Sequence, residues 1–299
     1  MSEYHIPVML NECVEGLEIK SGGIYVDATF GGGGHSKAIL KKIGNGKLIA
    51  FDQDADAEMN ITKDERFVFI RHNFRFMKNF LEYLGIQKVD GILADLGVSW
   101  HQFDDAGRGF SFRHDAQLDM RMNNTASTSA QQVVNEYDIE KLKKIFYEFG
   151  ELHNAAAIAS AICRVREREK ITTTTQLIRC LSPLIPKKRE HKFLAKVFQA
   201  IRIEVNNEME ALRELLVQAA DLITAGGRLV VISYHSLEDT MVKHFLRAGN
   251  FSGIPDKDIY GNVIAPFRPA QNKALVPSGK EIALNNRARS AKLRIGIKN

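Results

Sequence analysis

The segment I-Y-V-D-A-T-F-G-G-G-G-H-S, from Ile24 to Ser36, is the most informative part of this chain. A short apolar run ends at Asp27, four consecutive glycines follow, and a helix-forming segment begins near Ser36. This order predicts a strand, a glycine-rich turn and the start of a helix. Glycines let the backbone approach a ligand closely, and a helix N-terminus offers unpaired N–H groups to an anion or a polar group. A nucleotide-like cofactor is therefore the first hypothesis.

Alternating strand and helix patterns continue on the C-terminal side of this turn. Asp52 ends a second apolar run, Phe74 follows a third, and Asp95 ends a fourth. The predicted strands cover residues 24–27, 47–51, 67–71 and 89–94. A β-α-β-α-β-α-β order predicts an α/β fold with a doubly wound parallel sheet, whose ligands bind at the C-terminal ends of the strands.

Asp52 lies 18 residues after Gly34, close to the spacing of about 20 at which an acidic residue accepts hydrogen bonds from ribose hydroxyls. The alternative is a helix N-cap, since Q-D-A-D-A-E is also typical of a helix start. We favour Asp52 for the ribose and Asp54 for the cap. Phe74 is suited to pack against an adenine face, although core packing explains it equally well.

The pattern changes after residue 103. Residues 104–124 are rich in Gly, Arg and Asp, and helical patterns follow without a convincing strand before residue 200. This predicts an all-helical domain at 104–206, inserted into an α/β domain made of residues 1–103 and 207–299. A long helical pattern covers residues 192–223, with a break expected near Asn206 and Asn207. A fifth strand at 228–233 returns to the sheet, and Ser236 with Asp239 is interpreted as a capping box for the helix that follows.

The positive charge of the chain is concentrated near its C-terminus. The net charge is +5, while residues 268–299 carry eight Lys and Arg against one Glu, or +7, so the remaining chain is at −2. This distribution indicates a polyanionic partner such as RNA. A solvated surface tail is the open alternative.

Other features limit the location of the protein. The longest apolar run, residues 155–163, is too short to span a bilayer, and residues 1–7 do not resemble a secretory signal. Cys13, Cys163 and Cys180 form no metal or redox spacing, so we expect reduced thiols in a cytoplasmic protein with no metal site and no membrane contact.

The glycine run excludes two common nucleotide motifs. Counting from Gly31 or Gly32, the third glycine of G-x-G-x-x-G would be Ser36 or Lys37, and no G-x-x-x-x-G-K-[ST] occurs. A nicotinamide oxidoreductase or a P-loop protein is thus disfavoured. S-adenosylmethionine suits the turn better, because it has a ribose for Asp52 and an amino-acid end for the glycines, but no pyrophosphate.

Segments along nearly the whole chain, from His5 to Arg294, resemble the bacterial ribosomal RNA small subunit methyltransferase H family, also called MraW. They read D-A-T-F-G-G-G-G-H-S, F-D-Q-D, D-L-G-V-S-W-H-Q, R-G-F-S-F-R, L-D-M-R-M, F-Q-A-I-R-I-E-V-N, I-S-Y-H-S-L-E-D and R-A-R-S-A-K-L-R. The resemblance implies a Rossmann-like class I methyltransferase sheet. It also implies a cytoplasmic enzyme that moves a methyl group from S-adenosylmethionine to the exocyclic N4 amine of a decoding-centre cytidine in 16S rRNA of the small ribosomal subunit.

The resemblance also implies which residues contact the cofactor. These are Gly33, Gly34, His35, Asp52, Phe74, Asp95 and Gln102. One departure from the family pattern is Trp100, which stands where a small residue is usual. The helical insertion is expected to recognise RNA, and the sequence leaves both a monomer and a homodimer open.

The catalytic group stays open at this level. A cytosine N4 amine is a poor nucleophile, and acceptors for its protons would assist attack on a methyl group held in line about 3 Å away. Other amino-methyltransferases have D/N/S-P-P-Y at the end of strand four, whereas this chain has Asp95-Leu-Gly-Val. Asp95 suits the cofactor, the amine or both, and we favour the cofactor. Ser99, His235 and backbone carbonyls of this loop are weaker candidates for a base, and His235 is equally suited to a packing or capping role.

Several basic residues are candidates for phosphate contacts, although some are also placed to pair with acids such as Asp115, Asp119 and Glu204. They are Arg108, Arg113, Arg121, Arg202, Arg287, Arg289, Lys292 and Arg294. A target base must be single-stranded or flipped out of its stack. A methyltransferase for a small molecule or a protein, and a non-catalytic RNA-binding assembly factor, remain the alternatives.

Overall fold

The computed structural model describes residues 7–99, 102, 103, 105 and 107–299. The chain divides into two compact units. One consists of Met1–Gly97 with Met209–Asn299, and the other of Val98–Glu208. The helical insertion was expected at residues 104–206.

A seven-stranded sheet in the order β3-β2-β1-β4-β5-β7-β6 forms the centre of the first unit. Its strands are β1 Ile24–Asp27, β2 Lys47–Asp52, β3 Phe67–Arg71, β4 Val89–Asp95, β5 Ile223–Ser233, β6 Phe267–Pro269 and β7 Lys292–Lys298. β1 to β5 pair in parallel, and β7 pairs antiparallel with both β5 and β6. The order β3-β2-β1-β4-β5 is that of a doubly wound Rossmann-type sheet, so the predicted fold class is confirmed.

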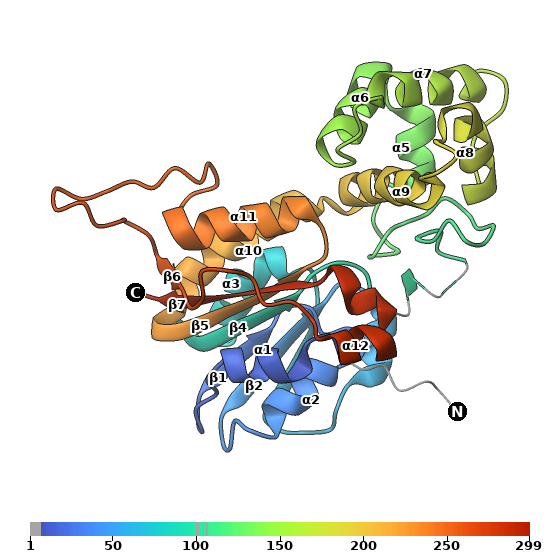
Figure 1. Cartoon of the computed structure of the whole chain (residues 1–299). Coiled ribbons are helices and arrows are strands. Elements are labelled where there is room, and N and C mark those ends of the chain that lie inside the picture. The colour runs from blue at the N-terminus through green and yellow to red at the C-terminus, as the bar shows by residue number, and fades with distance from the viewer. Residues whose placement is uncertain (1–6, 100–101, 104, 106) are drawn as a thin grey trace. The chain divides into compact units, whose positions relative to one another are not determined.

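Helices cover both faces of this sheet (Figure 1). They are α1 Leu10–Gly16, α2 Gly34–Leu40, α3 Met77–Tyr83, α10 Glu208–Leu222, α11 Ser236–Ala248 and α12 Gly279–Leu284, with the 3₁₀ turns η1 Ala55–Asn60, η2 Phe74–Phe76 and η4 Asn286–Ser290. One core cluster joins α3, α10 and α11 to the sheet, and another joins α1 and α2 to its other side. Because both faces are covered, the central strands read as continuous apolar runs, such as the fully buried residues 48–51.

The basic C-terminal segment is a strand of this sheet, so its interpretation as a solvated tail is wrong for β7. β7 lies between β5 and β6, and its Leu293 and Ile295 side chains are buried. The sequence K-L-R-I-G-I-K alternates charged and apolar residues, which is the period of two typical of a strand.

The second unit is helical, with its own buried core. Its elements are α5 Ala130–Glu136, α6 Ile139–Glu148, α7 Ala155–Arg166, α8 Thr174–Leu181, η3 Ser182–Leu184 and α9 Glu190–Asn206. Within the described part of this unit, β-type pairing is limited to one isolated bridge, Gln117 to Thr173. α9 ends where Asn207 takes a left-handed conformation, φ 50°, and this matches the break predicted near that residue.

No helix within the described ranges is long and apolar enough to span a membrane. Cys13, Cys163 and Cys180 are all free thiols, as expected. Burial raises the pKa of the Cys13 thiol well above its ordinary value, and the neighbouring Asp95 carboxylate adds to this shift. Cys13 is thus an inert packing residue of the core.

Candidate active site

Three carboxylates lie at the C-terminal ends of neighbouring parallel strands. Asp27 ends β1, Asp52 ends β2 and Asp95 ends β4, and β1 lies between the other two. Because parallel strands end at the same edge of a sheet, side chains far apart in sequence meet here. The prediction that these acidic residues share one edge is correct.

Asp52 is held by the backbone on both sides. Its Oδ2 accepts a hydrogen bond from the Gly31 N–H at 2.7 Å, and its Oδ1 accepts one from the Asp54 N–H at 2.9 Å. Asp54 in turn caps η1 by accepting a hydrogen bond from the Asp56 N–H, so the capping role predicted for Asp54 is confirmed. The contact fixes the Asp52 carboxylate against the glycine turn, while its predicted ribose contact stays a prediction.

The glycine turn is packed too closely for side chains. Gly33 has φ +72°, and a Cβ atom there would lie 2.9 Å from the Phe30 ring. A Cβ atom on Gly34 would lie 2.1 Å from the Pro7 ring. α2 begins at Gly34, two residues before the predicted start at Ser36, because Gly33 already serves as its left-handed N-cap. Gly33 and Gly34 are therefore required by the geometry of the turn itself.

His35 is buried and oriented by the backbone. Its Nε2 lies 3.1 Å from the Val8 carbonyl oxygen, and its Nδ1 lies 3.9 Å from Oδ2 of Asp95. Donation from Nε2 to the carbonyl directs Nδ1 toward the carboxylate. At 3.9 Å this contact is longer than a hydrogen bond, so His35 lies beside the Asp95 carboxylate without a hydrogen bond to it.

Asp95 has a partner that the sequence analysis missed. The Tyr234 hydroxyl donates a hydrogen bond to Oδ1 of Asp95 at 2.7 Å, and the Asp95 backbone N–H donates to the Thr29 hydroxyl at 2.6 Å. Tyr234 directly follows β5, which pairs with β4. The sequence could have indicated Tyr234 as a site residue, because in I-S-Y-H-S-L-E-D it immediately follows a predicted strand.

The charge of this edge is unbalanced. Burial raises the pKa of Asp52 and of Asp95 to about 6, and repulsion from Asp27 adds to both shifts. For Asp95, the nearby His35 and the Tyr234 hydroxyl oppose the increase. Burial likewise raises the pKa of Asp27, which accepts a hydrogen bond from the Ser36 hydroxyl at 2.6 Å. None of the three pairs with a Lys or Arg of the described chain, so the edge favours a ligand that carries positive charge.

Phe74 and Gln102 lie in different units. Phe74 begins η2 after a two-residue turn that follows β3, and it packs, half-buried, against the core cluster beneath α3 and α10. Gln102 belongs to the second unit, where it is buried. Its Oε1 accepts from the Ser99 N–H at 3.0 Å, and its own N–H donates to the Ser99 hydroxyl at 3.2 Å. Trp100, which departs from the family pattern, lies outside the described residues.

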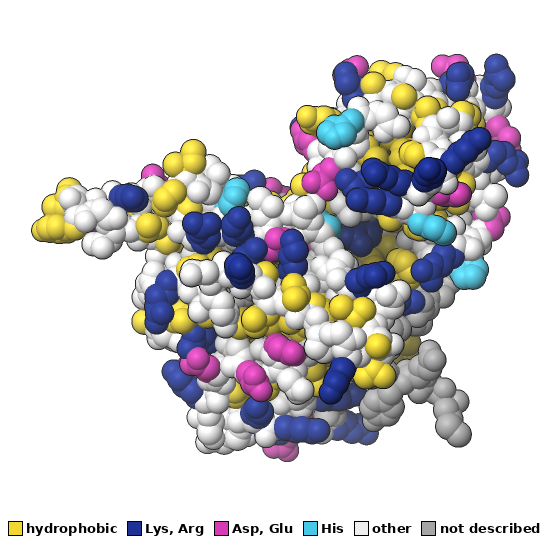
Figure 2. Space-filling view, viewed as in Figure 1, with side chains coloured by type: hydrophobic (Ala, Val, Ile, Leu, Met, Phe, Trp, Pro, Cys, Tyr) yellow, Lys and Arg dark blue, Asp and Glu magenta, His cyan; other side chains and the backbone are white. Residues whose placement is uncertain are grey.

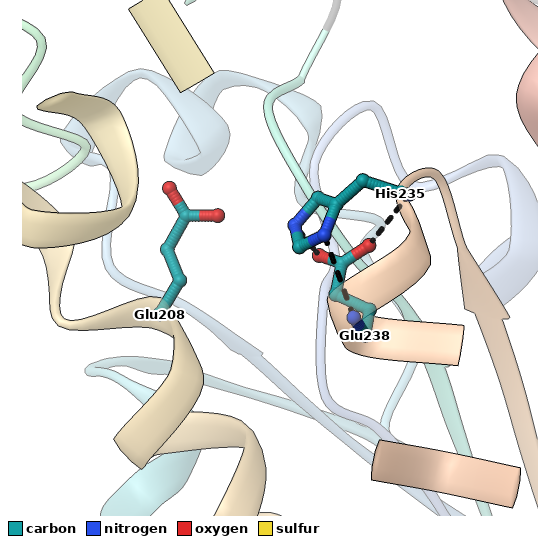
Figure 3. Close-up of side chains that lie close together, drawn as sticks. All are labelled: Glu208, His235 and Glu238. Carbon is teal, nitrogen blue, oxygen red and sulfur yellow. Dashed lines mark hydrogen bonds and ion pairs between the residues drawn. The ribbon is translucent and has the colours of Figure 1, made fainter. Parts of the chain in front are cut away.

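The prediction that Ser236 and Asp239 form the capping box of α11 is wrong, because the box lies one residue earlier in the chain. His235 is the N-cap, in extended backbone, and Glu238 is its reciprocal partner (Figure 3). The Glu238 N–H donates to Nδ1 of His235 at 3.4 Å, and Oε2 of Glu238 accepts from the Tyr234 N–H at 2.8 Å. A capping box usually begins with Ser or Thr, whose hydroxyl accepts the hydrogen bond, whereas an imidazole nitrogen accepts it here. The prediction from the sequence therefore chose Ser236.

Most of the basic residues proposed as phosphate contacts already have partners. Arg121 pairs with Asp119 at 2.7 Å, as expected, and Arg202 pairs with Glu208 at 2.8 Å. Arg108 donates to the carbonyl oxygens of Arg121 and Met122. Asp115 and Glu204 have other partners, the Thr175 N–H and Lys141. Lys292 and Arg294 both bind Asp239, whereas the side chains of Arg113 and Arg289 make no hydrogen bond or ion pair within the described ranges.

A family model for the MraW methylase family matches residues 2–299. The chain belongs to this family. The predicted family is thereby confirmed, and with it methyltransferase activity and S-adenosylmethionine as the cofactor. A cationic donor bound at this edge agrees with two observations. Gly33 and Gly34 leave no room for side chains in the turn, and the three carboxylates have no Lys or Arg partner among the described residues.

Similar proteins cover essentially the full chain. The chain is 55% identical over 296 residues to a ribosomal RNA small subunit methyltransferase H of Phocaeicola vulgatus, covering 99% of this chain and 97% of the relative. It is 56% identical over 291 residues to the protein of the same name in Flavobacterium psychrophilum, covering 97% and 100%. An rRNA methylase of Streptococcus thermophilus of known structure is 11% identical, with 99% of each chain covered and a TM-score of 0.44, which is too distant to bear on the site.

Proposed function

We propose that this chain transfers a methyl group from S-adenosylmethionine to the exocyclic N4 amine of a cytidine in 16S rRNA, at the decoding centre of the small ribosomal subunit. The observation that carries the proposal is the edge formed by Asp27, Asp52 and Asp95 beside the glycine turn. Relatives more than half identical to this chain are named ribosomal RNA small subunit methyltransferase H, which supports an rRNA substrate. The protein is expected to act in the cytoplasm.

Within this proposal the first unit binds the donor, which supplies an activated methyl group on a sulfonium. Asp52 accepts hydrogen bonds from the ribose hydroxyls, and Gly33, Gly34 and His35 adjoin the amino-acid end. Asp95 and Phe74 complete the set proposed for this unit. The fit rests on charge, because uncompensated carboxylates attract a cationic ligand and repel an anionic one such as a dinucleotide.

Tyr234 and Glu238 position Asp95. Oε2 of the buried Glu238 accepts hydrogen bonds from the N–H groups of Tyr234, at 2.8 Å, and of His235, at 3.3 Å. This holds the turn between β5 and α11, and the turn holds the Tyr234 hydroxyl on Asp95. A fixed carboxylate can orient a ligand without rearrangement during the reaction.

The acceptor side requires little acid–base chemistry. The N4 lone pair is delocalised into the cytosine ring, so acceptors that bind the amine protons favour attack. Nδ1 of His235 already accepts the Glu238 N–H, which directs its lone pair to the helix cap. Among the groups named from the sequence, Asp95, the Ser99 hydroxyl and backbone carbonyls then remain, and no general base is assigned.

We assign RNA recognition to the second unit together with unpaired cations such as Arg113. Its compact helical core allows it to present a surface without disturbing the sheet of the first unit. The cytidine is expected to be single-stranded or flipped out, because N4 lies within the Watson–Crick face of a paired base.

Transfer of tritiated methyl onto small subunits from cells that lack this protein tests the proposal. We expect the label on one cytidine of 16S rRNA, identified by mapping of the labelled nucleotide. Label only on protein, on the large subunit or on free nucleosides would contradict the RNA assignment. Calorimetry addresses the non-catalytic alternative, which predicts no S-adenosylmethionine binding and no effect of Asp52→Ala.

A further inference from the structure

A cavity of about 190 Å³ lies on the first unit, on the side of the sheet that carries β5, β7 and β6. Its polar lining comes from three segments, namely α11, the stretch after β6, and β7. These side chains are Lys243, Arg247, Gln271, Asn272, Lys273 and Arg294. Figure 2 shows Lys and Arg side chains gathered over α11 and the strand beneath it. The cavity is separate from the ends of β1, β2 and β4, where the carboxylates lie.

Three of the four cations around this cavity, Lys243, Arg247 and Lys273, lack a counter-charge among the described residues. No Asp or Glu is among the described residues that line it. The side chains of Lys243, Arg247 and Lys273 form no hydrogen bond or ion pair within the described part of the chain. Cations held together without an anion repel one another, so the arrangement favours a negatively charged ligand.

Arg294 is held in place and directed toward the cavity. Its Nε donates a hydrogen bond to Oδ1 of Asp239 at 2.6 Å. Nζ of Lys292 donates to Oδ2 of the same carboxylate at 2.9 Å. The Arg294 side chain is only 14% exposed. Its two terminal nitrogens have no hydrogen bond within the described ranges, so they are available to a ligand. Because Asp239 is already occupied by both cations, it does not neutralise the remaining ones.

A solvated basic surface is the simpler explanation, and it accounts for only part of the arrangement. Arg247 lies in the last turn of α11, where a cation interacts favourably with the helix dipole. Lys273 and Arg294 come from other segments and gain nothing from that dipole. The cavity is also smaller than the roughly 300–1,000 Å³ typical of drug-sized ligands, which indicates a compact anionic group.

We propose that this cavity binds a phosphate group of the RNA backbone, at a distance from the methylated base. A phosphate accepts paired hydrogen bonds from a guanidinium such as Arg294, point-charge contacts from lysines, and N–H donation from the amides of Gln271 and Asn272. The RNA source of this phosphate rests on the proposed function. The phosphate chemistry itself does not.

Paired substitutions test this contact in the full-length protein. Lys243→Gln with Lys273→Gln removes two cations from the cavity. Lys41→Gln with Lys42→Gln is the matched control, since these two lysines at the end of α2 are exposed and their side chains have no polar partner among the described residues. Binding of a fluorescent single-stranded RNA oligonucleotide is measured across a salt titration. S-adenosylmethionine calorimetry checks that each variant is folded, and Lys273→Gln alone, on an exposed loop, provides a mild second variant.

The expected result follows from counterion release. On single strands each neutralised phosphate contributes about 0.7 to the slope of log affinity against log salt, so loss of the one cavity phosphate should lower that slope by up to about 0.7. The same relation gives a roughly fourfold loss of affinity near 0.15 M salt. The control pair should leave the slope unchanged. Equal losses in both pairs would mean non-specific attraction and would overturn the proposal.

A measurement with inorganic phosphate distinguishes an RNA phosphate from free phosphate as the ligand of this cavity. Stabilisation of the protein by inorganic phosphate is measured by thermal unfolding against chloride at equal ionic strength. If phosphate stabilises the wild type but not the cavity pair, while the RNA slopes stay equal, the cavity binds free phosphate and the RNA source is rejected. If neither probe distinguishes the cavity pair from the wild type, the site is rejected. Both measurements are independent of methyl transfer, so their failure is distinguishable from failure of the proposed function.

Discussion

Replacing Asp52 with asparagine is the most direct test of the strand-edge carboxylates, and its effect on stability is small by cancellation. Asp52 has a pKa of about 6, against 3.8 in an unfolded chain, so its ionised form destabilises the native protein by up to about 3 kcal/mol at 1.36 kcal/mol per pH unit. The partial exposure of the side chain makes this an upper value. The Asp52→Asn substitution would remove this cost but leave the Gly31 or Asp54 N–H facing an amide N–H, which costs about 1–3 kcal/mol.

The dependence of stability on pH reveals the charge more clearly. Because the native pKa is raised, the stabilising contribution of Asp52 is complete below pH 3.8 and is lost as the pH rises through 6. Between pH 5.0 and 7.5 this loss amounts to about 1.4 kcal/mol in the wild type. Asp52→Asn should abolish that part of the slope and leave the part due to Asp95. Urea unfolding at several pH values measures the difference.

Donor binding should respond to the same substitution. A ribose hydroxyl bonded to a charged carboxylate contributes about 1.5–3 kcal/mol, so Asp52→Asn should weaken S-adenosylmethionine binding by roughly 10- to 150-fold at pH 7.5. At pH 5.0 only about one wild-type Asp52 in eleven is ionised, and the wild-type affinity should fall roughly tenfold through this residue alone. The variant should lack this decrease. Calorimetry at pH 5.0, 6.0 and 7.5 measures both effects.

Asp221→Asn is the matched control. Asp221 is exposed, and among the described residues its carboxylate pairs with Lys78 alone, at 3.2 Å on the surface, an interaction of about 0–1 kcal/mol. It should change neither the pH slope nor donor binding. The reasoning is refuted if Asp52→Asn binds the donor as tightly as the wild type, or if its stability keeps the wild-type dependence on pH.

Three further substitutions examine the surrounding structure. Tyr234→Phe removes the hydroxyl that donates a hydrogen bond to Asp95, so the pKa of that carboxyl should rise further. The pH midpoint of donor binding, measured by calorimetry, should then move upward. An unchanged midpoint would argue against this positioning role. Gly33→Ala adds a Cβ atom 2.9 Å from the Phe30 ring at φ +72°, and urea unfolding should show a loss of at least about 1–2 kcal/mol, whereas wild-type stability would disprove the packing of the turn. Asp239→Asn removes the charge shared by two cations of β7 and should cost about 1–3 kcal/mol in the free energy of unfolding; no change would mean that this contact does not secure the strand.

The local parts of this protein could be predicted from its sequence. The strands that end at Asp27, Asp52 and Asp95, the glycine turn, the cap at Asp54 and the break near residue 207 each depend on neighbouring residues only. Apolar periodicity, glycine conformations and helix caps act over a few residues, so they are readable from a single chain. The sequence also predicted that the ends of these strands lie at one edge of the sheet, because a parallel β-α-β order requires it.

Only the tertiary structure showed what those elements contact. The Tyr234 hydroxyl and the Asp95 carboxylate are 139 residues apart in sequence, and their hydrogen bond exists because β5 pairs with β4. In the same way β7 lies inside the sheet because it pairs with both β5 and β6, although its charges suggested a solvated tail. Spacing along the chain does not specify which strand lies beside which, because pairing is selected by burial of the whole sheet face, a property of the assembled core.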